Sequence, residues 1–169
     1  RKRANKIVPR THSWKRTSDI KPMGFAGYKA GMTQIHFIDN RPKSPTKGEE
    51  IRLPVTVVET PSLSVFSLRL YSSDAYGSKI LGEAWSEQID ATLARRLSLP
   101  KKRNPEALKS LQEKIPEASE VRVLVHTQPK LTATAQKTPD VMELALGGSN
   151  VQEQFEYAKS ILGNQLSVS

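Results

Sequence analysis

The sequence contains no cysteine, which excludes disulfide bonds, thiolate catalysis and cysteine-ligated zinc and fits a reducing compartment. It has no apolar run near 18 residues and no apolar leader, so we expect neither a membrane span nor a secretory signal. P-loop, dinucleotide-binding and nucleophile-elbow motifs are also missing, and the three histidines, at positions 12, 36 and 126, are too dispersed to predict a metal site. These absences favour a protein without catalytic residues, resident metal or cofactor; structural ions between the protein and a phosphate-bearing partner stay open.

Positive charge is in excess, and it is concentrated in the first third of the chain. The 169 residues carry 26 Lys and Arg against 17 Asp and Glu, a net charge of +9. Residues 1–52 hold 13 basic and 4 acidic residues, so the remaining 117 residues are neutral overall. Within residues 1–21, here called the basic arm, only Asp19 opposes eight cations. These are Arg1, Lys2, Arg3, Lys6, Arg10, Lys15, Arg16 and Lys21.

The phosphates of a nucleic acid are the counter-charge that we expect for the basic arm. A solubilising tail, a nuclear address and a polybasic membrane contact are the competing explanations. His12 and Trp14 favour nucleic acid, because planar side chains stack on exposed bases, although Trp14 also fits a packing role against the protein itself. Since residues 1–21 contain few sizeable apolar side chains, we expect the arm to lack structure in the free protein.

The stretch from Gly24 to Asp39, GFAGYKAGMTQIHFID, is predicted to be the first core strand. Its three glycines surround Tyr28 and Lys29, where they allow close approach to a partner or only shape a bend. Residues 41–54 follow as a proline-rich loop. Its cations Arg41, Lys43 and Lys47 are interpreted as an extension of the basic footprint.

Beyond the loop, the hydrophobic pattern predicts a mainly β fold with inserted α-helices, of the α+β class. Strands are expected at 53–59, 63–71, 78–85, 120–126 and 140–146. In the second of these, Phe66, Leu68 and Leu70 are predicted to share one face. Helices are expected around Ile89–Leu97, from Asn104 to Ile115 and from Asn150 to Leu162. Short strands at this spacing are typical of an antiparallel sheet or barrel.

Five stretches together carry a resemblance to a known family. They are GFAGYKAGMT, RPKSPTKG, LPVTVVETP, VRVLVHTQPKL and VMELALGGSNVQEQFEYAK. They resemble, in this order and along essentially the whole chain, the archaeal and eukaryotic type of large-subunit ribosomal protein L-three. The resemblance implies a translation-protein type β-barrel with a long basic N-terminal extension, binding to large-subunit rRNA, a role in subunit assembly, and a cytoplasmic location in the large ribosomal subunit.

The resemblance also implies an organisation for this chain. Residues 1–23 correspond to an RNA-binding extension and residues 24–169 to a partial barrel domain, with a helical insertion at about 87–120. Proteins of the family continue beyond the equivalent of Ser169, so we expect the missing C-terminal half of the same protein among the partners, beside rRNA and neighbouring ribosomal proteins. The family's influence on the peptidyl transferase centre is not carried over to these residues.

The sequence thus predicts one set of RNA contacts and leaves a second function class open. The predicted contacts are Arg1, Lys2, Arg3, Lys6, Arg10, His12, Trp14, Lys15, Arg16, Lys21, Tyr28, Lys29, Arg41, Lys43, Lys47, His126 and Lys130. The alternative is a nucleic-acid-processing enzyme in which the basic arm only recruits substrate. It requires a cluster of acid, base or metal-binding residues, which the sequence does not display.

Overall fold

The computed structural model describes residues 8, 11, 13–15, 17–100, 104 and 106–168. The chain divides into two compact units, of which the first comprises residues 1–26 and 61–169 and the second is Gly27–Thr60. The first unit carries the larger sheet and the helices, and the second is a two-stranded hairpin. The predicted division into residues 1–23 and 24–169 stays a prediction.

The sheet of the first unit is antiparallel throughout. Its strand order is β4 (Gly77–Trp85), β3 (Leu63–Asp74), β5 (Glu120–His126) and β6 (Val141–Ala145), and the two-residue β7 (Gln165–Leu166) pairs with the start of β3. The predicted α+β class with predominant strands is confirmed. The sheets do not close into a barrel within the described part of the chain.

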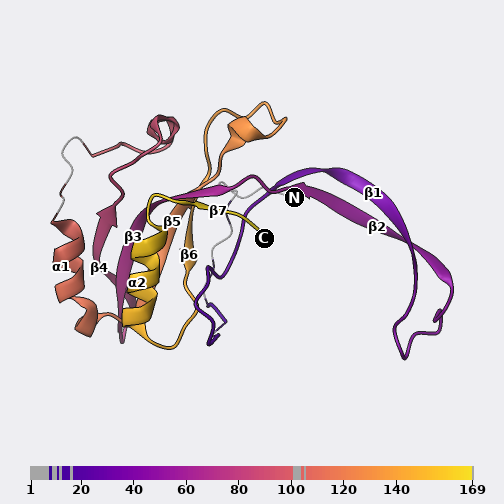
Figure 1. The fold of residues 1–169 in the computed structure, drawn as a ribbon, viewed down its shortest axis with the longest axis horizontal. Helices are drawn as coiled ribbons and strands as arrows, with labels where there is room; N and C mark the ends of the chain where they lie inside the picture. Colours follow the sequence, from indigo (N-terminus) through magenta and orange to yellow (C-terminus); the bar gives the residue numbers. More distant parts are fainter. Residues whose placement is uncertain are drawn as a thin grey trace. The chain divides into compact units, whose positions relative to one another are not determined.

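Among the described residues, two α-helices and three short 3-10 helices accompany this sheet (Figure 1). Helix α2 (Val151–Ile161) packs on β5, and α1 (Ala107–Glu113) packs on β4. The 3-10 helices are η1 (Ala91–Arg95), η2 (Ile115–Glu117) and η3 (Pro129–Leu131). In the described part of the chain, every helix falls short of the length and apolar character needed to cross a membrane.

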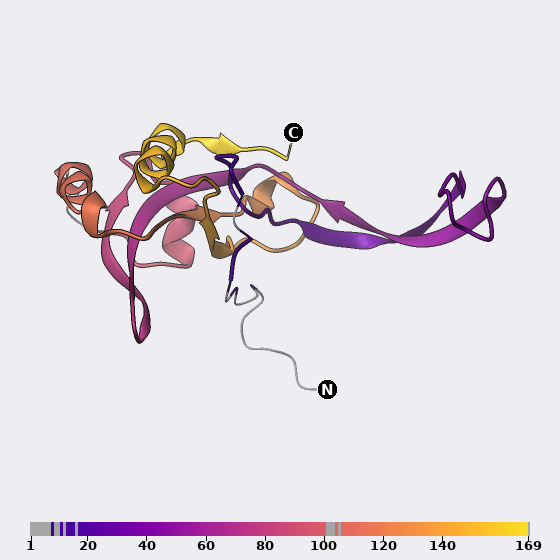
Figure 2. The same ribbon diagram turned by 90° about the horizontal axis from the view of Figure 1, so that it is seen from below.

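Apolar side chains fill both sides of the sheet, where they form two clusters. The larger cluster joins the fully buried Val121, Val123 and Val125 of β5 to Phe155 and Ala158 of α2. The smaller cluster centres on Phe66, Leu93 and Leu124. Figure 2 shows α2 on one side of the sheet and the segment with η1 on the other. The alternation along β5 therefore places Val121, Val123 and Val125 on one buried face, as the sequence predicted.

The prediction that Phe66 shares a face with Leu68 and Leu70 is wrong. The pairing of β3 with β5 shifts by one residue between Val65 and Ser67, which marks a β-bulge. A bulge leaves one residue out of the alternation, so Leu68 stays in the larger cluster while Phe66 packs with Leu93 in the smaller one. The hydrophobic pattern alone does not reveal such a shift.

The helix predictions hold at two places and fail at a third. Asn150 caps α2 by accepting a hydrogen bond from the amide of Gln152 at 3.0 Å, and Leu111 of α1 is buried as predicted. Between Ile89 and Leu97, however, the structure contains only the single 3-10 turn of η1. Leu93 is buried, and Ile89 and Leu97 pack partly buried against the same cluster, so the predicted inward positions are reached without a full helix.

The second unit pairs β1 (Tyr28–Ile38) with β2 (Glu50–Glu59) over its whole length. The prediction that β1 is a core strand is wrong, because most of its side chains are exposed. Cross-strand partners share a face, and one face carries Thr33 as the only polar member among seven side chains. The other members are Ile35, Phe37, Ile51, Leu53, Val55 and Val57. We call this set the apolar face of the hairpin; Ile35, Leu53 and Val57 are 44%, 42% and 46% exposed.

At Gly27 the chain approaches its own second strand closely; the approach to a partner that the sequence left open for these glycines stays a prediction. A Cβ atom at this position would lie 2.6 Å from Cγ1 of Val58 and 2.9 Å from the carbonyl oxygen of Glu59. Those distances leave no space for a side chain, so glycine is required where β1 begins beside the end of β2. At Gly31, by contrast, a Cβ would meet nothing within 4 Å.

Candidate nucleic-acid interface

The loop between β1 and β2 is organised around the carboxylate of Asp39, which is fully buried. Its Oδ1 accepts hydrogen bonds from the backbone amide of Arg41 at 3.0 Å and from Nε of the same residue at 2.9 Å. Its Oδ2 accepts from Nη2 of Arg41 at 3.0 Å, from the hydroxyl of Ser44 at 2.6 Å and from that of Thr46 at 2.8 Å. One carboxylate therefore fixes three separate positions of the loop.

Backbone hydrogen bonds close the same loop. The amide of Asp39 donates to the carbonyl of Glu49 at 3.1 Å, and the amide of Gly48 donates to the carbonyl of Asp39 at 2.8 Å. Gly48 has a φ of 87°, a left-handed conformation that glycine adopts at little cost. The ends of the loop are thus joined by the main chain, while Asp39 holds its middle.

The electrostatics of the loop follow from this arrangement. The side-chain hydrogen bond from Arg41, followed by that from Ser44, holds the pKa of Asp39 far below its usual range. The carboxylate is therefore ionised at neutral pH and forms an ion pair with Arg41, whose side chain is still 69% exposed. Lys43 and Lys47 are exposed on the same loop and have no ion-pair partner in the described part of the chain. The loop thus presents two unpaired cations on a rigid frame.

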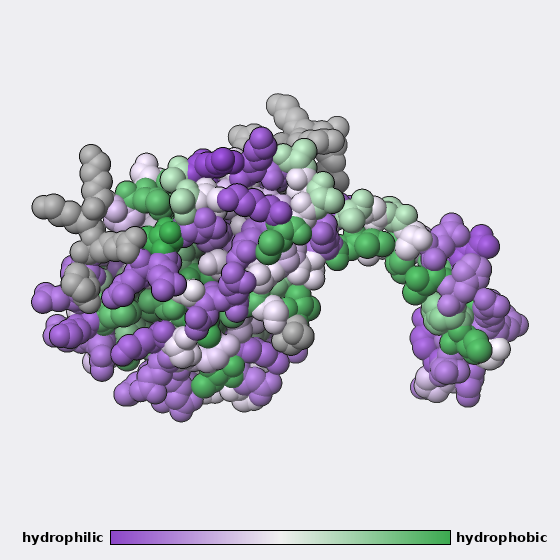
Figure 3. All heavy atoms as spheres, turned by 45° about the horizontal axis from the view of Figure 1, so that its top comes forward, coloured by the Kyte–Doolittle hydropathy of each residue, from purple (hydrophilic) through white to green (hydrophobic). Residues whose placement is uncertain are grey.

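The three predicted cations of the loop are brought together, whereas Tyr28 and Lys29 lie at the other end of the hairpin. The hairpin's surface in Figure 3 shows apolar residues along the strands and polar residues at the loop end. Sequence reasoning missed Asp39 itself. Its signal was available, because an aspartate followed by serine and threonine within a turn-forming stretch is a typical side-chain-to-backbone turn pattern.

Part of the basic arm is hydrogen-bonded to the rest of the first unit. The amide of Gly148 donates to the carbonyl of Thr17 at 2.9 Å, the amide of Gly147 to that of Lys21 at 2.8 Å, and the amide of Met23 to that of Ala145 at 2.9 Å. The expectation that all of residues 1–21 lack structure therefore does not hold for residues 17–21. Lys21 is exposed and pairs with the exposed Asp19 at 3.2 Å.

The other four predicted RNA contacts among the described residues have very different surroundings. Trp14 is half-buried against the larger core cluster, which is the packing role left open by the sequence. His126 is 1% exposed, with its ring centroid 6.0 Å from that of Phe66, so its burial argues against a direct contact with RNA. Lys15 and Lys130 are exposed. The roles of all these residues toward RNA stay predictions.

Seven predicted contacts lie outside the described residues, and the structure gives no account of them. They are Arg1, Lys2, Arg3, Lys6, Arg10, His12 and Arg16. Within the described ranges, no group of three or more His, Asp or Glu side chains is placed to hold a metal ion. The enzyme alternative thus gains no supporting cluster from the described residues.

Comparisons with known proteins give one consistent result. Residues 1–169 match the family model described as ribosomal protein L3. The chain is 51% identical over 171 residues to the large ribosomal subunit protein uL3 of Archaeoglobus fulgidus, and 46% identical to the proteins of that name from Methanococcus maripaludis strain C7 and Methanothrix harundinacea. Each alignment includes the whole of this chain but 51% of the relative. The chain therefore spans about half the length of the curated relatives that it matches.

Proposed function

Because this chain belongs to the ribosomal protein L3 family, we propose that it is a structural, non-catalytic constituent of the large ribosomal subunit that binds large-subunit rRNA and supports subunit assembly. The observation that carries the proposal is the match to archaeal relatives along the whole chain. The same relatives support a cytoplasmic location, in assembled subunits, beside neighbouring ribosomal proteins.

The proposed mechanism is neutralisation of backbone phosphates by preplaced cations. Lys43 and Lys47 are held on a loop that Asp39 fixes before any RNA binds, so little backbone conformational entropy is lost when they meet phosphates. The cations of the basic arm extend this contact, and counterion release makes the binding strongly dependent on salt. Recognition then follows the shape and phosphate positions of a folded RNA, with few contacts to base edges.

We also propose that the rest of the full-length protein completes a translation-protein type barrel. Two observations support this. An isolated two-stranded hairpin is only marginally stable in water. The apolar face of this hairpin is about half exposed at Ile35, Leu53 and Val57, so a further element that covers it would stabilise the hairpin. The curated relatives are about twice as long as this chain, so they contain enough further residues to supply the missing strands and cover that face.

A binding experiment with two RNAs tests the function. The chain is titrated with a fragment of archaeal large-subunit rRNA and with a small-subunit rRNA fragment of equal length and structure content. We expect tighter binding of the large-subunit fragment, and a loss of affinity in the double variant Lys43→Ala, Lys47→Ala. The matched control replaces Lys109 and Lys159, which lie on helices outside the predicted interface. Equal binding of both RNAs would contradict a specific role in the large subunit.

A further inference from the structure

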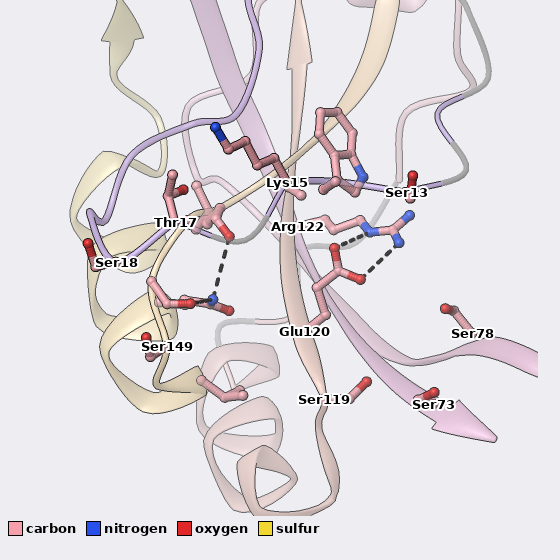
Figure 4. A pocket seen from close by; sticks show the side chains of 17 residues that line it. Ser13, Lys15, Thr17, Ser18, Ser73, Ser78, Ser119, Glu120, Arg122 and Ser149 are labelled. Carbon is pink, nitrogen blue, oxygen red and sulfur yellow. Dashed lines mark hydrogen bonds and ion pairs between the residues drawn. The ribbon is translucent and has the colours of Figure 1, made fainter.

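A cleft of about 680 Å³ opens in the first unit beside the start of β5 and the N-terminus of α2. Four parts of the chain line it: residues 13–15 with 17–18, the end of β3 with the start of β4, the segment around residues 119–122, and the segment from 145 to 154. Figure 4 shows the labelled hydroxyl groups around this opening, on segments that are far apart in the sequence. The six serines among them are Ser13, Ser18, Ser73, Ser78, Ser119 and Ser149.

The charges in the cleft are unevenly compensated. Nε and Nη2 of Arg122 donate to the two carboxylate oxygens of Glu120 at 3.0 and 2.9 Å, so this cation is already paired. Lys15 has no ion-pair partner among the described residues. In Figure 4 its ammonium group and the guanidinium group of Arg122 extend toward opposite sides of the cleft. Lys15 is therefore the cation that is available to an anion.

Trp14 adds an aromatic ring to the lining of the cleft. Its Nε1 is buried without a hydrogen-bond partner among the described residues. Because this nitrogen has essentially no accessible surface, a ligand in the cleft can contact the indole ring but not its N–H group.

We propose that the cleft binds a nucleotide unit of an RNA backbone, with its phosphate at Lys15, its ribose 2′-hydroxyl against the serines, and the Trp14 ring beside it. This inference rests on the proposed function and adds a site to it. Serine hydroxyls both donate and accept hydrogen bonds, as the ribose 2′-hydroxyl does. The lining therefore matches RNA better than DNA, and its polarity does not suit an apolar ligand.

Filling the cleft without changing its charge tests the site. Ser78 lies opposite Ser73 at the exposed end of the β3–β4 ladder, so Ser78→Leu adds bulk in a strand position that tolerates it. We expect this variant to bind a large-subunit rRNA fragment about 3- to 10-fold more weakly, the equivalent of one or two hydrogen bonds. The control Ser160→Leu, on the exposed side of α2, should bind like the parent. Against DNA of the same sequence, Ser78→Leu should matter less.

A second readout does not depend on any cleft variant folding. The chain has two tryptophans, so Trp85→Phe leaves Trp14 as the only one and keeps an aromatic ring beside Phe66. Quenching of Trp14 fluorescence by acrylamide should fall when the rRNA fragment binds. Inorganic phosphate alone should have a smaller effect, since it offers no ribose.

The outcomes separate the site from the function. Weaker RNA binding by Ser78→Leu together with protection of Trp14 supports the cleft. If RNA binds but neither the Ser78→Leu affinity nor the Trp14 quenching changes, the cleft proposal is overturned while the proposed function stands. If no large-subunit RNA binds the parent chain, both are overturned. Equal Trp14 protection by phosphate and RNA would show an anion site without recognition of ribose, which contradicts the proposal.

Discussion

The hydroxyl of Tyr71 on β3 donates a hydrogen bond to the carboxylate of Glu143 on β6 at 2.5 Å, across the intervening strand β5. Glu143 also lies 3.8 Å from Nη1 of Arg69 and 3.9 Å from Nη1 of Arg122. The guanidinium carbon of Arg122 is 4.4 Å from the centroid of the Tyr71 ring. This network joins three strands on one face of the sheet, in addition to the backbone ladder.

The Tyr71 network predicts a loss of stability at alkaline pH. Burial, followed by the hydrogen bond to Glu143, raises the pKa of Tyr71. Because the pKa of Tyr71 is higher in the folded protein, the stabilisation that Tyr71 contributes is complete below its unfolded-state pKa near 10. It is lost as the pH rises through the folded-state pKa. We expect Tyr71→Phe to lower the free energy of unfolding by about 1 to 2 kcal/mol at pH 8 and to reduce the further loss above pH 10, measured by urea denaturation.

Tyr157→Phe is the matched control, since this partly buried tyrosine lies on α2 and takes no part in the Tyr71 network. Its unfolding free energy should keep the alkaline loss of the parent protein. An identical alkaline loss in Tyr71→Phe and the parent would show that the ionisation of Tyr71 does not contribute.

The sequence was most informative where one local pattern determines one contact. The alternation of Val121, Val123 and Val125 correctly identified a buried strand face, and Asn150 correctly identified the start of a helix. It failed for β1, because the pattern of Ile35 and Phe37 shows an apolar face but not whether another element covers it. A bulge such as that beside Phe66 depends on the pairing of two strands and has no signature in one of them.

The Asp39 loop and the cleft also differ in how far the sequence could have predicted them. The Asp39 loop is built from residues within eleven positions of each other, so its turn chemistry could have been identified from the sequence. The cleft brings Lys15, Ser78 and Ser149 together through the fold. Residues so far apart in the chain become neighbours only through strand pairing and docking of the basic arm, which spacing does not encode.

Replacing Asp39 should change the affinity for RNA in the direction opposite to that expected from net charge alone. Asp39→Asn removes a negative charge from a basic loop, which on Coulomb grounds alone would strengthen RNA binding. The amide, however, replaces an acceptor by a donor facing Arg41, Ser44 and Thr46. We expect faster amide exchange across residues 39–49 and weaker binding of large-subunit rRNA. Glu49→Gln, an exposed acid on the same loop, should instead bind equally well or better.

The loop should also persist in acid. Because the pKa of Asp39 is depressed in the folded protein, its contribution is present above the unfolded value near 4 and is lost only as pH falls through the folded pKa. Amide exchange of Arg41 and Gly48, corrected for the intrinsic pH dependence, should therefore stay slow between pH 5 and about pH 3. Loss of protection with a midpoint near pH 4 would mean that the carboxylate has its ordinary affinity for protons.

The apolar face of the hairpin predicts self-association of the isolated chain. Replacing Ile35 and Leu53 by Thr keeps strand propensity and removes apolar surface, so we expect a larger monomer fraction by sedimentation velocity. The control replaces Met32 and Ile38, which are more exposed but lie on the opposite, more polar face. Addition of the remaining half of a full-length relative should suppress the association of the parent chain. Equal monomer fractions in the two double variants would argue against the proposal that the rest of the full-length protein covers this face.

The basic arm and Trp14 predict two changes that can be measured separately. Among the described residues, hydrogen bonds between the arm and the core begin at Thr17, so deletion of residues 1–10 leaves those bonds in place while removing five cations. If roughly half of these cations reach phosphates, the slope of log affinity against log salt should flatten by about 2.

Trp14→Ala should instead lower the free energy of unfolding by about 1 to 3 kcal/mol, because the indole packs against the core, and should leave the slope nearly unchanged. Titrations at several salt concentrations, combined with denaturation, distinguish the two; an unaltered slope after the deletion would refute the arm as a phosphate contact.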